Sequence, residues 1–496
     1  MPRQAASPWS AAGLNRRGEK ISVIIPVLNE APTIGSVVEF AWRSPLVSEV
    51  IVLDDGSIDG TPERARSAGA RVVTSTMLGK GGSMEDGVQM AANELLLYLD
   101  GDLTGLEPEL ITRMAEPLLA DKADFVKARF TRSAGRVTVL TARPLLRTYF
   151  PELTGFDQPL GGIIAGKRKL LAGLQFESDY GVDIGLLIDA VMHKARIAEV
   201  DVGHIEHDSQ PLAELEEMAV QVARTILNRA ARYGRLRSSF GWKVQETERL
   251  QRAEVTAALG RLLPTEHLAL FDMDGVILQG RFIVELARRT GRREALAEFL
   301  DHGELSPEER TRRIGALFAG VPAEVFQSCA REMTLMAGAV ETVVGLRKAG
   351  FRVGIVTDSY DTAAEVVRRR VFADFSIANL MSFRNGCATG RVTLAPAMAH
   401  PHGCLRHKHC KANVLLHLME KLGIRREGVL AVGDGENDLC LLQQAGCSVA
   451  FQPKTSGVRD AAMHLLSGTL AGILEVVKLA CFDLAQPGPL AGKSAR

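Results

Sequence analysis

The sequence predicts an α/β protein made of two separate α/β units, and three observations support that prediction. Short aliphatic runs alternate with helix-like stretches, which is the pattern of a parallel sheet with crossover helices. This pattern occurs before residue 210 and again after residue 265, with a charged helical stretch between. The length of 496 residues is also too great for one ordinary core.

In the first unit, strand-like runs are expected at 21–28, 49–53, 70–73 and 95–99. The acidic clusters Asp54–Asp55 and Asp100–Asp102 directly follow two of these runs. Ligands of parallel α/β sheets bind at the carboxyl ends of the strands, so the clusters mark a candidate site. In the second unit, 351–357 and 428–432 are the clearest strand-like runs, and 281–345 is helix-like without strands.

The composition narrows the class of protein. Lys and Arg number 59 and Asp and Glu also number 59, a balance that argues against a nucleic-acid-binding protein. No apolar run is long enough to cross a bilayer, so no membrane partner is expected. The seven cysteines all follow residue 328 in odd number and irregular spacing, which favours free thiols in a reducing cytoplasm.

These patterns predict a domain organisation. The expected segments are a disordered leader at 1–19, a first domain at 20–235, a helical connector at 236–264, a second domain at 265–485 with a helical cap at about 281–345, and a flexible tail at 486–496.

Four motifs occur in order in the second unit: F-D-M-D-G at 271–275, V-T-D at 356–358, Lys411, and G-D-G-E-N-D at 433–438. The three motifs other than Lys411 each follow or end a strand-like run. This ordered set resembles the haloacid dehalogenase-like phosphatases, in particular their phosphoserine-phosphatase-like branch, over roughly residues 266–475. The resemblance implies a Rossmann-like fold with a helical cap and Mg²⁺-dependent hydrolysis of a phosphate ester.

The resemblance also implies individual roles. Asp272 is expected to be the nucleophile that forms an aspartyl-phosphate, because covalent catalysis divides ester hydrolysis into two easier displacements. Asp274 is expected to act as general acid and then base. Thr357 is expected to bind a phosphoryl oxygen and Lys411 to neutralise developing charge. The expected Mg²⁺ ligands are Asp272, Asp274 through its carbonyl, Asp434 and Asp438.

One position departs from the family pattern. Phosphoserine phosphatases carry Glu nine residues after the nucleophile, where it suits the substrate amine, and here Arg281 takes that place. The expected cap also contains Arg310, Arg312 and Arg313. A cationic cap suits a substrate with an extra carboxylate, although solvated surface arginines are an equally good interpretation. Phosphoserine is therefore in doubt as the substrate.

The segment 400–410 (HPHGCLRHKHC) is rich in histidine and cysteine. Its spacings match no established tetrahedral zinc pattern. Because the segment directly precedes Lys411, we interpret it as a basic loop facing phosphate or as a surface loop without a role in the site.

In the first unit, I-P-V-L-N-E at 25–30, L-D-D-G-S at 53–57 and D-G-D at 100–102 resemble GT-A glycosyltransferases. In that fold a divalent metal neutralises the departing nucleoside diphosphate. More specific are G-K-G at 79–81, G-R-V-T at 135–138, Q-P-L-G-G at 158–162, Y-G-V-D at 180–183 and E-H at 206–207. Together these motifs resemble the glucosyl-3-phosphoglycerate synthase family over about residues 20–230. That family transfers glucose, with retention, from a nucleoside diphosphate to the 2-hydroxyl of 3-phosphoglycerate.

This second resemblance implies ligand contacts residue by residue. Asp102 and His207 are expected to bind Mg²⁺ or Mn²⁺. The nucleotide is expected to contact Pro26, Glu30, Ser57 and Lys80; the sugar Leu160, Gly161, Tyr180 and Asp183; and the acceptor Gly135, Arg136 and Thr138. Arg136 beside a glycine is a suitable bidentate clamp for an anion. Three departures put the sugar in doubt: Asp183 and Ile163 stand where the family has Glu, and Ser209 where it has Asn.

The two resemblances together suggest a coupled function. A synthase of this kind makes a phosphorylated glycoside, and a phosphatase would release the glycosylglycerate, a compatible solute. The expected partners are a UDP- or GDP-linked hexose, with glucose or mannose as the sugar, and 3-phosphoglycerate, in a homodimer. Alternatives are a polyprenyl-phosphate glycosyltransferase joined to an unrelated phosphatase, a phosphatase for a different glycosylated acid or polyol, and a transferase domain retained for regulation alone.

Overall fold

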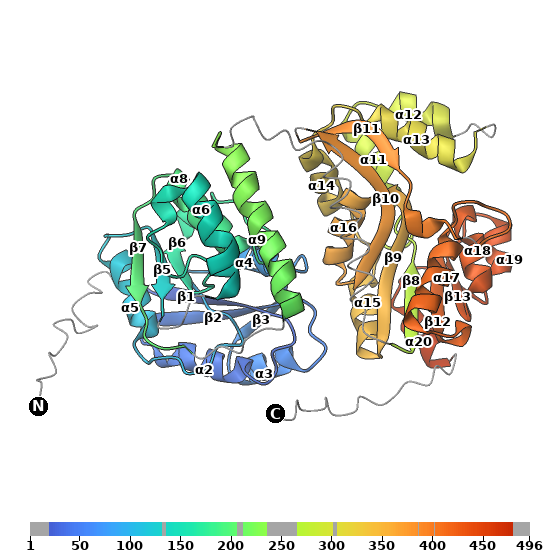
Figure 1. The fold of residues 1–496 in the computed structure, drawn as a ribbon. Helices are drawn as coiled ribbons and strands as arrows, with labels where there is room; N and C mark the ends of the chain where they lie inside the picture. The colour runs from blue at the N-terminus through green and yellow to red at the C-terminus, as the bar shows by residue number, and fades with distance from the viewer. Residues whose placement is uncertain are drawn as a thin grey trace, which may run out of the picture. The chain divides into compact units, whose positions relative to one another are not determined.

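The computed structural model describes residues 19–130, 135–205, 212–235, 265–300, 305–384, 386–400 and 402–479. The chain divides into two compact units, residues 1–240 and residues 241–496 (Figure 1). Predictions for the leader at 1–18, the connector at 236–264 and the tail at 486–496 lie outside the described residues.

The first unit contains a seven-stranded sheet, and its four predicted strands are confirmed as β1 to β4. The strand order is β3-β2-β1-β4-β6-β5-β7, with β6 antiparallel to both β4 and β5. The strands are β1 (Ile21–Val27), β2 (Val47–Asp54), β3 (Arg71–Thr74), β4 (Leu95–Tyr98), β5 (Phe125–Arg129), β6 (Ile164–Lys167) and β7 (Ile197–Asp201).

Helices cover both faces of this sheet and enclose two apolar cores (Figure 1). Alternation along β1 sends Val23 and Ile25 into one core and Ile24 into the other. One face is covered by α2 (Ile34–Arg43), α3 (Thr61–Ser67) and α5 (Leu110–Leu119). The opposite face is covered by α4 (Lys80–Met90), α6 (Arg143–Tyr149), α8 (Val182–Met192) and α9 (Leu212–Arg232). The short α7 (Arg168–Leu171) follows β6.

The second unit is built on another seven-stranded sheet, of order β11-β10-β9-β8-β12-β13-β14. All neighbouring strands are parallel except β10 and β11, which form an antiparallel pair. The strands are β8 (His267–Phe271), β9 (Phe351–Tyr360), β10 (Phe375–Arg384), β11 (Cys387–Thr393), β12 (Val429–Gly433), β13 (Cys447–Phe451) and β14 (His464–Leu466).

On one side of this sheet, α17 (Lys411–Leu422), α18 (Leu439–Gln444) and α19 (Ser456–Ala461) share a core with β8 and β12. Two further helices contact β9: α15 (Ala339–Lys348) and α16 (Asp361–Arg370). The last helix of the described residues is α20 (Gly472–Leu479), which packs against α15.

Four helices form the cap region: α11 (Phe282–Arg289), α12 (Arg293–Leu300), α13 (Pro307–Leu317) and α14 (Ala323–Glu332). Aromatic packing joins them to the sheet, with Phe326 of α14 at the centre. Its ring lies 6.4 Å from Phe282, 6.1 Å from Phe318, 6.0 Å from Tyr360 of β9 and 5.3 Å from Phe383 of β10. The cap therefore has a fixed apolar attachment to the domain that it covers.

The predicted α/β fold class is confirmed for both units. Within the described ranges, no helix combines the length and apolar character needed to span a bilayer.

Candidate functional site

The candidate phosphatase site lies where two adjacent parallel strands end. Asp272 follows β8 and Asp434 follows β12, and the Asp272 backbone N–H donates to the Val432 carbonyl at 2.9 Å. The parallel register brings both carboxylates to the same edge of the sheet. Asp438 joins them, so that one oxygen from each of the three buried carboxylates lies within 4.8 Å of the others.

Lys411 is the cation of this cluster. It is the first residue of α17, and its Nζ lies 2.7 Å from Asp272 Oδ1 and 2.8 Å from Asp438 Oδ1. Burial opposes protonation of Lys411, but the two carboxylates outweigh it and raise its pKa. Burial and the nearby Asp438 carboxylate raise the pKa of Asp272 well above its usual range. One buried ammonium thus holds two carboxylates that repel each other.

Asp438 also shapes the loop after β12. Its Oδ2 accepts hydrogen bonds from the Asp434 N–H at 3.0 Å and from the Gly435 N–H at 3.1 Å. Asp434 in turn contacts Lys454 Nζ at 2.6 Å. No sequence motif pointed to Lys454, because it follows β13 and reaches the site only through the strand order.

The carboxylate cluster fits Mg²⁺. The three buried carboxylates face one buried ammonium, since the Lys454 side chain is 51% exposed, and a divalent cation would balance the excess negative charge. Gly275, at φ +90°, leaves space beside this cluster: a Cβ there would lie 1.9 Å from Asp434 Oδ2. Hard oxygen ligands that carry excess negative charge are the environment that Mg²⁺ selects.

Asp274 lies beside the cluster at the entrance to the cap. Its Oδ1 accepts a hydrogen bond of 2.8 Å from the Phe282 N–H, the first residue of α11. Burial raises the pKa of Asp274 to about 6, and the nearby Arg281 guanidinium limits that rise. A carboxyl group in this range both donates and accepts a proton near neutral pH. Thr357 on β9 is fully buried, and its Oγ1 accepts from the Ser359 N–H at 3.1 Å.

The candidate transferase site centres on Lys80, the first residue of α4. Its Nζ lies 2.8 Å from Asp100 Oδ1 and 3.0 Å from Asp183 Oδ2. Burial opposes its charge, but the two carboxylates raise the pKa of Lys80. Gly162 makes this approach possible, because a Cβ there would lie 2.5 Å from Lys80 Nζ. Asp183 was predicted to contact sugar, and the structure places it against this lysine.

Negative charge accumulates next to Lys80. Burial, together with the nearby Asp102 and Asp100 carboxylates, raises the pKa of Glu30 to about 9. The Glu30 Oε2 atom is buried without a hydrogen-bond partner. A Cβ at Gly101 would lie 2.0 Å from that atom. A divalent cation at Asp102 would relieve this repulsion, so the acidic side of the site fits a metal. His207, the other predicted ligand, lies outside the described residues.

Asp55, which follows β2, orders the loops that surround the site. Buried Asp55 accepts hydrogen bonds from the Ser75 hydroxyl at 2.5 Å, from the Gly79 N–H at 2.9 Å and from the Ser83 hydroxyl, which fixes the turn into α4. Ser57, predicted to contact the nucleotide, is buried and accepts from the Asn29 N–H at 2.9 Å. These contacts join the ends of β1, β2 and β3.

The remaining predicted contacts are more dispersed. Pro26 is buried in β1, Leu160 and Gly161 are partly buried, and the Tyr180 side chain is 48% exposed. Gly135 and Arg136 are exposed at the start of a short π-helix, Thr138–Ala142, in which Thr138 is buried. The structure thus brings Lys80, Asp183 and the acidic residues together, and leaves Arg136 on the surface.

Lys127 was missed by the sequence analysis. It lies in β5, is fully buried, and its Nζ donates to the Asp183 carbonyl at 3.5 Å. Burial lowers its pKa to about 8. A lysine flanked by apolar residues on both sides (F-V-K-A) is the signal that the sequence carried for it.

Comparisons with known proteins agree with the division of the chain into two units of different function. Residues 22–171 match the model of glycosyl transferase family 2, and residues 269–443 match that of haloacid dehalogenase-like hydrolases. Over 247 residues the chain is 38% identical to glucosyl-3-phosphoglycerate synthase of Mycolicibacterium smegmatis, which covers 45% of this chain and 82% of the relative. Over 220 residues it is 34% identical to phosphoserine phosphatase SerB2 of Mycobacterium tuberculosis, covering 43% of this chain and 52% of the relative.

Among solved structures, glucosyl-3-phosphoglycerate synthase from M. tuberculosis in complex with Mn²⁺, UDP and glucosyl-3-phosphoglycerate is 38% identical. The match covers 46% of this chain and 87% of that chain, with a TM-score of 0.44.

The fold and the two sites define a two-domain enzyme, a glycosyltransferase followed by a haloacid dehalogenase-like phosphatase. Through its N-terminal domain the chain belongs to the glucosyl-3-phosphoglycerate synthase family.

Proposed function

We propose that this protein makes a glycosylglycerate in two steps on one chain. The first domain transfers glucose, or mannose, with retention from a nucleotide sugar to 3-phosphoglycerate, and the second removes the phosphate. The observation that carries the proposal is that one chain contains both a domain 38% identical to a glucosyl-3-phosphoglycerate synthase and a cluster of three buried carboxylates in which Lys411 contacts Asp272.

In the transferase domain, Asp102 and His207 would hold Mg²⁺ or Mn²⁺, which neutralises the departing diphosphate when bound. Lys80, already placed beside the acidic residues, carries the positive charge nearest to the proposed nucleotide site. The exposed guanidinium of Arg136 is available to an incoming carboxylate or phosphate. The full proposed sets are Pro26, Glu30, Ser57 and Lys80 for the nucleotide; Leu160, Gly161, Tyr180 and Asp183 for the sugar; and Gly135, Arg136 and Thr138 for the acceptor.

In the phosphatase domain, Asp272 attacks the phosphorus and forms an aspartyl-phosphate while Asp274 protonates the leaving glycerate oxygen. Asp274 then takes a proton from the water that hydrolyses this intermediate. Lys411 stabilises the negative charge of both transition states, and Thr357 binds a phosphoryl oxygen. The residues that would hold Mg²⁺ are Asp272, Asp434 and Asp438, with the Asp274 carbonyl, and the ion would supply further charge neutralisation.

The coupling has a chemical rationale. Hydrolysis of the phosphate ester removes the product of the first step, which makes net synthesis irreversible. A tether between the two domains raises the effective concentration of the intermediate at the second site. We also propose that the protein is a cytoplasmic homodimer; the six cysteines recorded among the described residues are all free thiols, as a reducing compartment requires. Sedimentation of the purified chain tests the dimer.

The test of the coupled function is phosphate release by the wild-type protein. We expect release only when a UDP- or GDP-hexose and 3-phosphoglycerate are both present with Mg²⁺, and mass spectrometry should find the glycosylglycerate. Equally fast hydrolysis of 3-phosphoglycerate or phosphoserine without donor would contradict the proposal. A polyprenyl phosphate acceptor is tested in the same assay, by replacing 3-phosphoglycerate.

Arg281 is the residue that should separate this phosphatase from a phosphoserine phosphatase. It is an exposed residue directly before α11, and its charge opposes the rise in the pKa of Asp274, so it lies near the site. We expect Arg281→Glu to favour phosphoserine, which carries an amine. The ratio of kcat/KM for the glycosylated substrate to kcat/KM for phosphoserine should fall by about 10-fold or more. Steady-state kinetics on both substrates measures this ratio.

The matched control is Arg293→Glu, which makes the same change at an exposed position at the start of α12. The control should leave the ratio near that of wild type. An equal shift in both variants would show that only the overall charge of the cap matters.

A further inference from the structure

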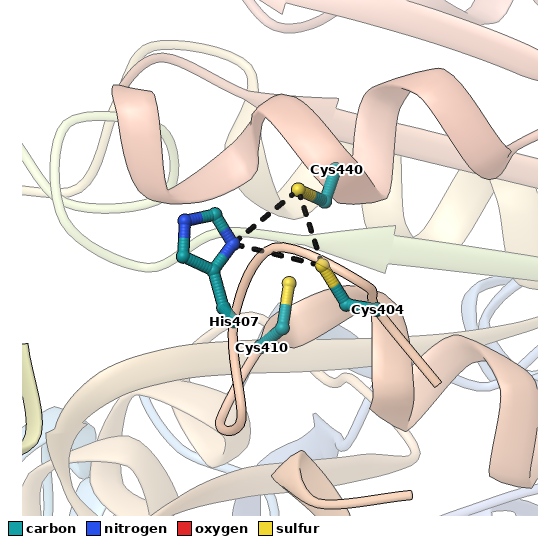
Figure 2. Close-up of side chains that lie close together, drawn as sticks. All are labelled: Cys404, His407, Cys410 and Cys440. Atoms are coloured by element: carbon teal, nitrogen blue, oxygen red, sulfur yellow. Dashed lines mark hydrogen bonds between the residues drawn. The ribbon is translucent and has the colours of Figure 1, made fainter. Parts of the chain in front are cut away.

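The histidine- and cysteine-rich segment before α17 takes part in a group of four side chains that the sequence spacing did not reveal. Three of its side chains, Cys404, His407 and Cys410, turn toward a fourth, Cys440 of α18. Figure 2 shows the three sulfur atoms and a ring nitrogen of His407 facing a common point. All four potential ligand atoms lie within 4.8 Å of one another. His400 and His402, in the same segment, do not belong to this group.

The distances within the group fit a tetrahedral ion. With Zn–S bonds of about 2.3 Å and Zn–N bonds of about 2.0–2.1 Å, tetrahedral geometry separates two sulfurs by about 3.8 Å and a sulfur from a nitrogen by about 3.6 Å. Here the Sγ atoms of Cys404 and Cys440 are 3.6 Å apart. His407 Nδ1 lies 3.6 Å from the first and 3.5 Å from the second. Three edges of the tetrahedron are therefore already at the length that the ion requires.

A disulfide does not explain the arrangement. The sulfurs of a disulfide are about 2.05 Å apart, whereas the Cys404 and Cys440 sulfurs are separated by 3.6 Å, and all of the cysteines in the group are free. A disulfide would also leave Cys410 and His407 without a function in the group. Three thiols and one imidazole are instead the ligand set of a closed Cys₃His site, which selects a soft-ligand metal such as zinc.

Hydrogen bonds to Asn413 hold the loop that carries these residues, but few apolar contacts stabilise the loop itself. The buried Asn413 accepts a hydrogen bond from the Cys404 N–H at 2.7 Å and donates to the Met398 carbonyl at 2.8 Å. At the tip of the loop, the Leu405 side chain is fully exposed. Cys410, Cys440 and Ala412 are buried as a small group separate from the main core. A bound ion would supply the stabilisation that this loop lacks.

We propose that these four side chains bind one structural Zn²⁺ ion, which joins the loop before α17 to the start of α18. The location gives the ion a consequence for catalysis. Cys410 directly precedes Lys411, and Cys440 lies two residues after Asp438, so the ion fastens the same two helix starts that the Lys411–Asp438 ion pair connects. With all four ligands from the protein, the ion is structural and separate from the Mg²⁺ site.

Metal analysis of the purified full-length chain tests the proposal. After washing with EDTA under reducing conditions, we expect about one zinc per chain in the wild type, because thiolate sites retain zinc strongly. Cys404→Ser and Cys440→Ser should each lose most of this zinc. Cys387→Ser, the same substitution at a partly buried cysteine of β11 outside the group, should retain it.

A second measurement uses only the wild-type protein, so its result does not depend on whether a variant folds. Titration of the wild-type protein with a mercurial reagent should release zinc in step with thiol modification, and a dye that binds zinc records the release. Hydrogen exchange of residues 402–412 should increase on zinc removal, whereas exchange in β1 and β2 should not change.

Four results would overturn the proposal. They are absence of zinc from the wild-type protein, iron in its place, a Cys404–Cys440 disulfide in alkylated peptides, and zinc that is lost in Asp434→Asn but retained in the cysteine variants. The last result would place the zinc in the carboxylate cluster.

Discussion

Replacing Asp272 with asparagine is expected to abolish phosphate release and to make the phosphorylated glycoside accumulate. An asparagine amide cannot attack phosphorus, and loss of a catalytic nucleophile costs on the order of 10⁴-fold or more in turnover. The transferase step uses none of the residues around Asp272, so nucleotide release should continue near the wild-type rate. Mass spectrometry of the products, with a coupled assay for UDP or GDP, measures both outcomes.

The substitution should not unfold the domain. Asparagine has nearly the shape of aspartate, and Lys411 keeps its contact of 2.8 Å with Asp438 when the Asp272 charge is removed. Burial and repulsion from Asp438 already raise the pKa of Asp272, so its negative charge is unfavourable in the folded state. We therefore expect the free energy of unfolding to stay constant or to rise by about 1 kcal/mol. Urea denaturation measures this change.

The control for this variant is Asp460→Asn, an identical substitution at an exposed position in α19. It should retain both activities and leave the stability within about 0.5 kcal/mol of wild type. If Asp272→Asn still released phosphate at a rate near that of wild type, Asp272 would not be the nucleophile. If phosphate release stopped but no phosphorylated glycoside accumulated, the two domains would not share an intermediate.

The features that the sequence predicted are those that a local pattern encodes. Buried strands such as β1 and β12 show as short aliphatic runs, and Asp272 and Asp434, the proposed nucleophile and a proposed metal ligand, directly follow β8 and β12. The resemblance of the motifs to known phosphatases predicted that these residues act together, and the structure brings them to one edge because the carboxyl ends of parallel strands meet there. Lys80 was predicted through the G-K-G motif of the synthase resemblance, and it is the first residue of α4.

The features that were missed depend on contacts between distant segments. Cys440 completes the cysteine–histidine group from α18, so no spacing within residues 400–410 could reveal a fourth ligand. Lys454 reaches Asp434 only because β13 pairs with β12. Asp183 was predicted to contact sugar from a motif, and its pairing with Lys80 required the packing of α8 beside α4. Pairings of this kind follow from tertiary structure and leave no periodic signal.

Replacing Lys80 with methionine is expected to have the largest effect on the transferase domain. The side chain is 18% exposed and bridges Asp100 and Asp183, which are 22% and 5% exposed. Removing one partner of a buried ion pair leaves uncompensated charge and costs about 3 kcal/mol or more in stability. Loss of this cation beside a nucleotide diphosphate should lower the transferase rate by about 10²-fold or more. Urea denaturation and UDP or GDP release measure the two effects.

Lys167 offers a matched control, because it also bridges two carboxylates of the same domain. Its partners Asp121 and Asp124 lie at 2.6 and 2.7 Å, but Asp121 is 73% exposed and solvent screens the pair. Lys167→Met should therefore cost no more than about 1 kcal/mol and leave transfer unchanged. Equal losses in the two variants would show that burial does not distinguish the two lysines.

A double variant separates the contribution of Lys80 to folding from its contribution to transfer. Asp100→Asn in the Lys80→Met background removes the charge of one of the two carboxylates that Lys80 bridges, so part of the lost stability should return. Activity should not return with it, because the missing positive charge is what the diphosphate requires. Lys80→Arg should also fail to restore transfer, since Lys80 Nζ lies close against Gly162 and a guanidinium is bulkier than an ammonium. Recovery of activity together with stability would instead show that Lys80 serves only to hold the fold.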